Sequence, residues 1–160
     1  METRKALRLD GYDYSAQGAY FLTLCTQNRR CILSRVGRDD LGAPCVCLTA
    51  AGCIVDRYIR SISAAYPHIV VDQYIIMPNH VHLLLTVLHN DGAPGSSRPT
   101  ALIPRVVAAL KRFTNQEAGC KLWQTSYYDH IIRDEADYTA RYNYILDNPR
   151  RWAEDEYYIP

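Results

Sequence analysis

The sequence predicts a single α+β domain in which helices pack on an antiparallel β-sheet. Alternating, β-rich runs at residues 20–26, 69–77 and 80–88 predict three strands, because strand side chains alternate between the two faces. Apolar residues at helical spacing over residues 49–65 and 103–113 predict two helices. The resulting β-α-β-β-α order is that of a ferredoxin-like or RRM-like sandwich.

Proline and glycine residues mark where these elements begin and end. Pro104 is expected near the first turn of the second helix, and Gly119 follows the end of that helix. Pro78 and Asn79 predict a turn that joins the second and third strands as a hairpin. Stretches rich in glycine, proline and polar residues predict two loops, at residues 37–44 and 89–100.

The C-terminal part of the chain predicts a short strand followed by a last helix. The strand is expected within residues 122–133 and the helix at residues 134–147, where acidic residues in the first turn suit the positive end of the helix dipole. Pro149 ends this helix. Residues 154–160 are expected to form a tail that packs on the domain or provides a small contact surface.

Length and composition restrict the class of protein. The chain has 160 residues, which predicts one domain over residues 1–160 with a core of about residues 10–152. Its six cysteines form no C-x-x-C pair, so we expect them to be reduced and mostly buried in a cytoplasmic protein. No apolar run approaches the ~20 residues of a membrane span, so we expect no membrane partner.

Two histidines in the third strand are the strongest chemical signal. His80 and His82 are two residues apart, so on a strand they point to the same face. Two imidazoles on one face of an otherwise apolar strand are a reason to expect a metal ion. A solvated face that happens to carry two histidines is the alternative, and a metal site needs a third ligand.

The last helix offers that third ligand and a nucleophile. Tyr144 and Asn148 are four residues apart and share a helix face, and Asn148 lies at the helix end. A tyrosine one helical turn from a metal ligand is well placed to act as a nucleophile. A phenol of pKa ~10 needs a metal ion to assist its attack. Asp147 is a rival third ligand. The rival nucleophiles are Tyr142 and Tyr138.

Three motifs in order resemble one family. The first is Met77-Pro78-Asn79-His80-Val81-His82; the second is Trp123-Gln124 with Tyr128-Asp129-His130 and Ile132-Arg133; the third is Tyr144-Ile145-Leu146-Asp147-Asn148-Pro149. In this order and spacing they resemble the single-tyrosine HUH transposases of the insertion-sequence type, and above all the REP-associated tyrosine transposases. The resemblance covers about residues 10–152.

The resemblance implies an activity on single-stranded DNA. His80, His82 and Asn148 would hold Mg²⁺ or Mn²⁺, and Tyr144 would be the catalytic tyrosine. The tyrosine would cleave and later rejoin single-stranded DNA at hairpin sites through a 5′-phosphotyrosine intermediate. Members of this family are monomers or homodimers, and both remain open. The rival functions are a catalytically inactive hairpin-binding protein of the same fold and an unrelated metal hydrolase.

DNA contacts are expected from residues outside the motifs as well as within them. The net charge is only +1, but basic residues occur in local pairs that can bind phosphate. Aromatic residues near the short strand can contact DNA or brace the final helix. The candidate DNA-binding residues are Arg29, Arg30, Lys111, Arg112, Asn115, Tyr128 and His130.

Overall fold

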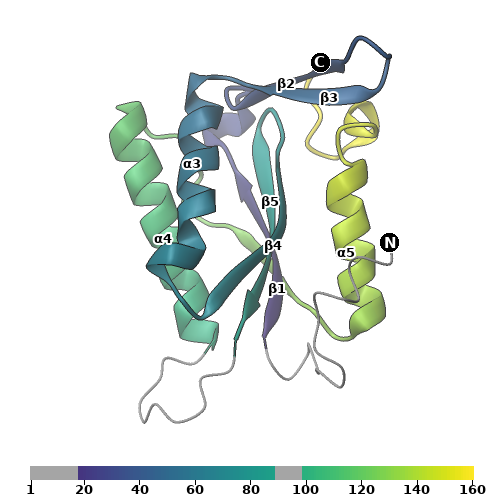
Figure 1. Cartoon of the computed structure of the whole chain (residues 1–160). Coiled ribbons are helices and arrows are strands. Elements are labelled where there is room, and N and C mark those ends of the chain that lie inside the picture. Colours follow the sequence, from purple (N-terminus) through teal and green to yellow (C-terminus); the bar gives the residue numbers. More distant parts are fainter. Residues whose placement is uncertain (1–17, 89–98) are drawn as a thin grey trace, which may run out of the picture.

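The computed structural model describes residues 18–88 and 99–160, and its elements follow the expected order (Figure 1). Six strands, three helices and two short 3-10 turns lie in the described residues. In chain order they are β1 (Ala19–Cys25), η1 (Gln27–Arg29), β2 (Ser34–Arg38), β3 (Pro44–Leu48), α3 (Ala50–Ala65), β4 (Ile69–Ile76), β5 (His80–Val87), α4 (Pro99–Ala118), β6 (Tyr128–Ile131), α5 (Glu135–Asp147) and η2 (Trp152–Glu154).

The main sheet has the strand order β4-β5-β1-β6, and all of its pairings are antiparallel. β1 and β5 are therefore the two central strands, and β5 is buried along its whole length. In the register of this pair His82 lies opposite Thr23, and His80 lies opposite Cys25. The histidines thus lie on a central strand that is paired on both sides.

Helices cover both faces of this sheet, which confirms the predicted α+β sandwich (Figure 1). α3 and α4 pack side by side on one face, and α5 packs on the other. Alternate residues of β5 serve the two layers: Val81, Leu83 and Leu85 join the core beneath α3 and α4, and Leu84 joins the smaller core beneath α5. His80 and His82 share the face of Leu84, so they point toward α5.

Side-chain caps explain where α3 and α5 begin. The Thr49 hydroxyl caps α3 by accepting from the backbone N–H of Gly52, and the Asp134 carboxylate caps α5 in the same way through Asp137. Gly52 lies so close to Leu33 that an added Cβ would be 2.0 Å from its carbonyl oxygen. α5 ends at Asp147, and its C-cap Asn148 lies immediately before Pro149.

The structure differs from the sequence-based expectations at two places, and a third expectation is largely untested. β2 and β3 form a separate two-stranded hairpin, which the predicted loop at 37–44 connects. α4 begins at Pro99, so Pro104 lies in its second turn instead of its first. Most of the predicted loop at 89–100 lies outside the described residues.

The expectation that the cysteines are mostly buried is wrong, although all six are free thiols. Cys25 in β1 is buried, whereas the others lie between η1 and β2, on β3, on α3 or just after α4; four of those five are exposed. β2 and β3 are largely exposed, and neither sequence shows the alternation of apolar and polar residues that predicts a strand.

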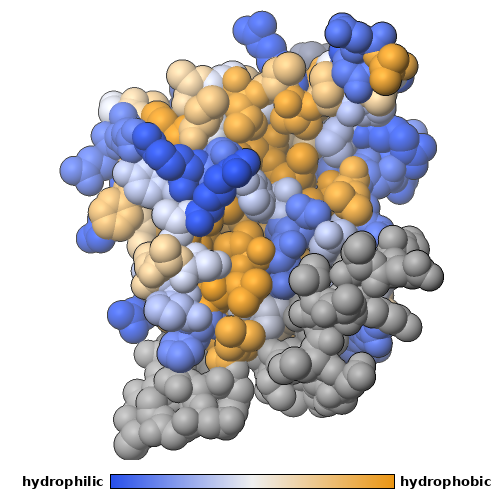
Figure 2. Space-filling model, viewed as in Figure 1, coloured by the Kyte–Doolittle hydropathy of each residue, from blue (hydrophilic) through white to orange (hydrophobic). Residues whose placement is uncertain are grey.

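Some large hydrophobic side chains remain exposed on the outer surface, among them Leu41, Ile131 and Leu146. Figure 2 shows a band of hydrophobic surface down the middle of one face, between more hydrophilic surfaces on each side. In the described residues, no helix is long and apolar enough to cross a membrane.

Candidate metal and nucleophile site

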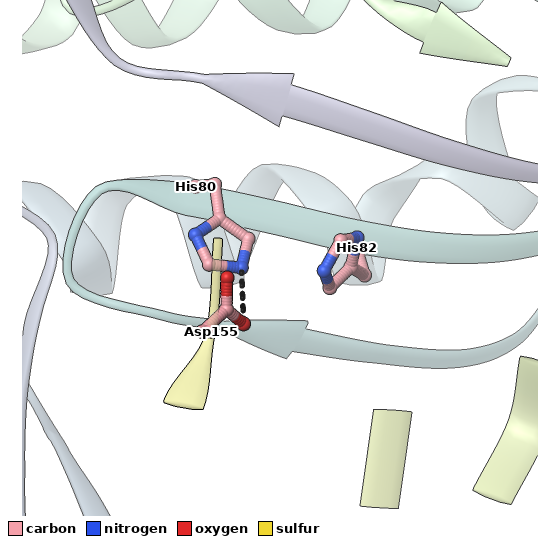
Figure 3. A group of neighbouring side chains, drawn as sticks. All are labelled: His80, His82 and Asp155. Atoms are coloured by element: carbon pink, nitrogen blue, oxygen red, sulfur yellow. Dashed lines mark ion pairs between the residues drawn. The ribbon is translucent and has the colours of Figure 1, made fainter. Parts of the chain in front are cut away.

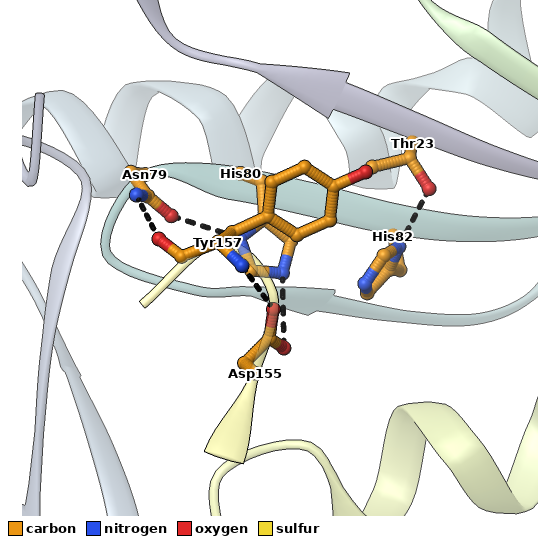
Figure 4. A network of polar contacts seen from close by, with 6 residues as sticks. All are labelled: Thr23, Asn79, His80, His82, Asp155 and Tyr157. Carbon is orange, nitrogen blue, oxygen red and sulfur yellow. Dashed lines mark hydrogen bonds and ion pairs between the residues drawn. The ribbon is translucent and has the colours of Figure 1, made fainter. Parts of the chain in front are cut away.

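Both histidines are buried and each is held by a hydrogen bond at Nδ1. His80 is 0% and His82 2% exposed. His80 Nδ1 lies 2.9 Å from Asn79 Oδ1, and His82 Nδ1 lies 2.8 Å from Thr23 Oγ1 (Figure 4). Such bonds fix the plane of each imidazole ring and leave Nε2 as the atom available to a ligand.

The hydrogen bonds of Asn79 determine which nitrogen of His80 carries the proton. The Asn79 amide donates to the backbone oxygen of Tyr157 at 2.7 Å, so its Oδ1 is the acceptor that faces His80. His80 Nδ1 must therefore be the donor, and the Nε2 lone pair is free. A neutral imidazole with a free Nε2 lone pair is the form that binds a metal ion.

Burial favours the neutral form of both rings. Burial lowers the pKa of His80 to about 4, although the nearby Asn148 amide partly opposes this shift. Burial also holds the pKa of His82 well below its usual range; a protonated His80 and the positive charge of Arg141 act in the same direction. Neither ring is therefore protonated at neutral pH.

Three buried polar atoms converge here without a protein partner. His80 Nε2, His82 Nε2 and Asn148 Oδ1 form no hydrogen bond within residues 18–88 and 99–160. Leaving such an atom unpaired costs about 1–3 kcal/mol. Asn148 Oδ1 and His80 Nε2 present lone pairs, and His82 Nε2 does so when its Nδ1 donates to Thr23. A cation between the three atoms would then satisfy all of them at once. This donor set fits the divalent metal ion expected from the sequence.

Asp155 adds a carboxylate that the sequence analysis did not identify. His80 Nε2 lies 3.9 Å from Asp155 Oδ2, and ligand atoms of His80, His82 and Asp155 all lie within 4.8 Å of one another (Figure 3). Burial raises the pKa of Asp155. No sequence spacing connects residue 155 with the histidines, because the chain after η2 folds back onto β5 only in three dimensions.

The structure separates the two candidates for the third ligand on α5. Asn148 is 3% exposed and close enough to His80 and Tyr144 to influence the pKa of each. The Asp147 carboxylate is instead held in a two-point pair with Arg150, at 2.7 and 2.8 Å. Asn148 is thus the member of this pair whose oxygen is directed toward the histidines.

Tyr144 lies beside the histidines and is accessible. Its ring is 5.3 Å from the His82 ring, and 38% of the residue is exposed. Burial and the negative charge of Asp155 raise the pKa of its phenol. The rival tyrosines are placed differently: Tyr138 is buried in the core beneath α5, and Tyr142 packs against that core and stacks near Tyr138.

A second tyrosine near the histidines comes from the C-terminal tail. The ring of Tyr157 is 4.6 Å from that of His80 and covers it (Figure 4). Burial raises the pKa of its phenol, which lies within hydrogen-bonding reach of the Cys25 thiol. Of the two possibilities for residues 154–160, packing on the domain is therefore the one observed.

Three of the candidate DNA-binding residues gather next to this site. Arg29, Tyr128 and His130 line a cavity of about 370 Å³ together with His82 and Tyr144. The Arg29 guanidinium lies 5.4 Å from the Tyr157 ring centre, and Tyr128 is 60% exposed on the edge strand β6. A second cavity, of about 680 Å³, lies on the other side of Tyr144, between α5 and the chain after it.

The other candidate DNA-binding residues lie elsewhere. Arg30 donates to backbone oxygens of Gln27 and Lys121. On α4, across the sheet from the histidines, the Lys111 ammonium donates to three carbonyls of residues 124–126, and the Asn115 side chain accepts from the backbone of Leu122. These contacts brace the chain between α4 and β6. Arg112 is exposed and lies 4.6 Å from the Phe113 ring centre.

Comparisons with known proteins support the resemblance inferred from the motifs. No protein-family model matches the chain. A protein of uncharacterized function from Haemophilus influenzae is 28% identical over an alignment of 173 positions, covering 98% of this chain and 93% of that protein. A putative REP-associated tyrosine transposase from the same organism is 23% identical over 150 positions, covering 86% of this chain and 73% of that protein.

A comparison of folds finds the same group of proteins as the sequence comparison. The chain superposes on the solved structure of a REP-associated tyrosine transposase bound to a REP hairpin with a TM-score of 0.60 and 21% identity. This match covers 90% of the present chain and 73% of the solved one. By sequence and by fold, this chain is similar to REP-associated tyrosine transposases.

Proposed function

We propose that this protein is a metal-dependent transposase that cleaves and rejoins single-stranded DNA at hairpin sites. The observation that carries the proposal is the convergence of three unpartnered buried ligand atoms beside an accessible tyrosine: His80 Nε2, His82 Nε2 and Asn148 Oδ1, next to Tyr144. The relative that was solved bound to a REP hairpin supports hairpin DNA as the substrate class.

His80, His82 and Asn148 are the proposed metal ligands, and Asp155 is a fourth. Two imidazoles, one amide oxygen and one carboxylate suit a divalent ion such as Mg²⁺ or Mn²⁺, with positions left for water or substrate. A bound divalent ion would polarise the scissile phosphate and balance the charge that develops during the reaction. Asn79 and Thr23 keep both Nε2 atoms directed at this position.

Tyr144 is the proposed nucleophile. Its phenolic oxygen forms a bond to the phosphorus while the bond from phosphorus to the 3′ oxygen of the preceding nucleotide breaks. The tyrosine loses its proton, the departing 3′ oxygen gains one, and a 5′-phosphotyrosine link remains. Attack by a 3′-OH on this link reverses the step and rejoins strands, so no external energy source is consumed.

A denaturing gel tests this proposal directly. The full chain is incubated with Mn²⁺ and a REP hairpin that carries a labelled single-stranded extension, and a covalent protein–DNA adduct is expected. Tyr144→Phe should abolish the adduct while hairpin binding persists. Tyr142→Phe is the matched control within α5 and should form the adduct normally.

Tyr157 provides a second discrimination, because its ring also contacts a histidine. Tyr157→Phe should retain the adduct if Tyr144 is the nucleophile. An adduct that persists in Tyr144→Phe and disappears in Tyr157→Phe would contradict the proposed roles.

One observation favours a second candidate, a hairpin-binding protein without cleavage activity. Tyr157 covers the His80 ring and is only 9% exposed, so the C-terminal tail limits access to the site in this conformation. Tight hairpin binding by wild type with no adduct in Mn²⁺ or Mg²⁺ would favour this candidate.

A further inference from the structure

Arg141 is a positive group at the site that neither the sequence motifs nor the proposed roles use. It lies three residues before Tyr144 on α5, so the two side chains share a helix face. Both line the cavity of about 370 Å³ that also contains His82. A cation beside a nucleophile and a metal site is placed where a phosphate has to bind.

The Phe21 ring contacts Arg141 as well as the groups proposed to react. The Arg141 guanidinium carbon lies 5.2 Å from the centre of this ring. The His82 ring stacks on the same ring at 5.0 Å, and the Tyr144 ring meets it edge-on at 6.1 Å. One rigid aromatic side chain of a central strand thus positions the cation, the nucleophile and one histidine.

The guanidinium retains donors for a ligand. Its Nε lies 3.5 Å from Asp137 Oδ1, and the other oxygen of Asp137 accepts from His130 and from the backbone of Arg133. In the part of the chain that the structure describes, the two terminal nitrogens of Arg141 form no hydrogen bond. The side chain is 37% exposed, so DNA can reach it.

The charges around the cavity are mixed, which restricts where a phosphate can bind. Arg29 and Arg141 are its cations, and Asp129 and Glu156 are its carboxylates. Arg141 is the cation that shares the Phe21 ring with His82 and Tyr144, so a phosphate within reach of Tyr144 is also close to this cation.

We propose that Arg141 binds the phosphate at the scissile position of a single strand and holds it in line with Tyr144. This proposal rests on the proposed function, because it concerns the substrate of that site. Planar guanidinium groups bind phosphate through two parallel hydrogen bonds, which fixes the orientation of the phosphate as well as its position. Lysine would supply the charge but not this geometry.

The main test measures binding alone, so that it does not depend on cleavage. In a Tyr144→Phe background, the affinity for a fluorescein-labelled oligothymidylate is measured by anisotropy over a range of salt concentrations. Loss of one phosphate contact to a single strand lowers the slope of log K against log salt by about 0.7. Arg141→Gln should show this change, and Arg141→Lys should retain most of the slope.

Arg60→Gln is the matched control. Arg60 forms the same i,i+4 pair with an aspartate, Asp56, but lies on α3, across the sheet from the histidines. The salt-dependence slope of Arg60→Gln should equal that of the Tyr144→Phe parent. An unchanged slope in Arg141→Gln, or an equal fall in Arg60→Gln, would overturn the proposal.

Cleavage gives a second readout that separates this inference from the proposed function. With Tyr144 present, Arg141→Gln should form the adduct about 100-fold more slowly, the usual loss when one donor to a transition-state oxyanion is removed. Its melting temperature and Mn²⁺ affinity should match wild type. Wild type that forms no adduct would overturn the proposed function; wild-type adduct rates in Arg141→Gln would overturn this inference alone.

Discussion

Replacing Asn148 by leucine should stabilise the metal-free protein and abolish its response to metal. Leucine has the same branched shape as asparagine but no polar atom, so it removes the unpaired Oδ1 that is buried beside His80. The relief is worth about 1–3 kcal/mol. Unfolding entropy of about 2.1 cal/mol/K per residue gives roughly 0.3 kcal/mol/K for 160 residues. The melting temperature should therefore rise by about 3–9 °C.

With metal present, wild type is instead the protein that should gain stability. A ligand at about 100 times its Kd stabilises the native state by roughly 2.7 kcal/mol, which is about 8 °C for a chain of this length. Wild type should show this increase with Mn²⁺, and Asn148→Leu should lose most of it. Thermal melts followed by circular dichroism in EDTA and in excess Mn²⁺ measure both effects.

Asn115 provides the matched control for this prediction. It is also an asparagine at the inner side of a helix, but its Oδ1 accepts from the backbone N–H of Leu122 at 2.7 Å. Asn115→Leu should therefore lower the melting temperature and leave the Mn²⁺ response intact. If Asn148→Leu is destabilised without metal and keeps the full Mn²⁺ shift, the metal-ligand reasoning is refuted.

Three further predictions concern the scaffold around the site. Gly52→Ala should destabilise the fold by about 1–3 kcal/mol in urea melts, because its Cβ would lie 2.0 Å from the carbonyl oxygen of Leu33; an unchanged midpoint would contradict the close packing. Lys111→Met should lower stability by roughly 1–3 kcal/mol through the loss of three carbonyl contacts, with hairpin affinity unchanged if the role is structural. Hydrogen bonds from the backbone of Arg133 and from His130 hold the pKa of Asp137 below its usual value against the opposing effect of burial. Such a depressed pKa stabilises the fold above the unfolded value of about 3.9, so the advantage of wild type over Asp137→Asn should be constant near neutral pH and disappear as acid protonates the folded carboxyl. A gap that widens in acid would show that the sign is wrong.

The sequence predicted the elements that alternate or repeat clearly. β1, β4, β5, α3 and α5 were located to within a residue or two, because their apolar residues follow a strand or helix period. The hairpin of β2 and β3 was missed because both strands are largely exposed and carry no such period.

For the site, sequence alone determined the residues related by short spacings. His80 and His82 share a face because strands alternate, and Tyr144 and Asn148 share a face because helices turn every 3.6 residues. Only the tertiary structure brought Asp155, Tyr157 and Arg141 to the same place, and only it directed Asn148, instead of Asp147, at the histidines. The physical reason is that local periodicity fixes which side chains share a face, whereas the packing of α5 and the C-terminal tail on the sheet fixes which faces meet.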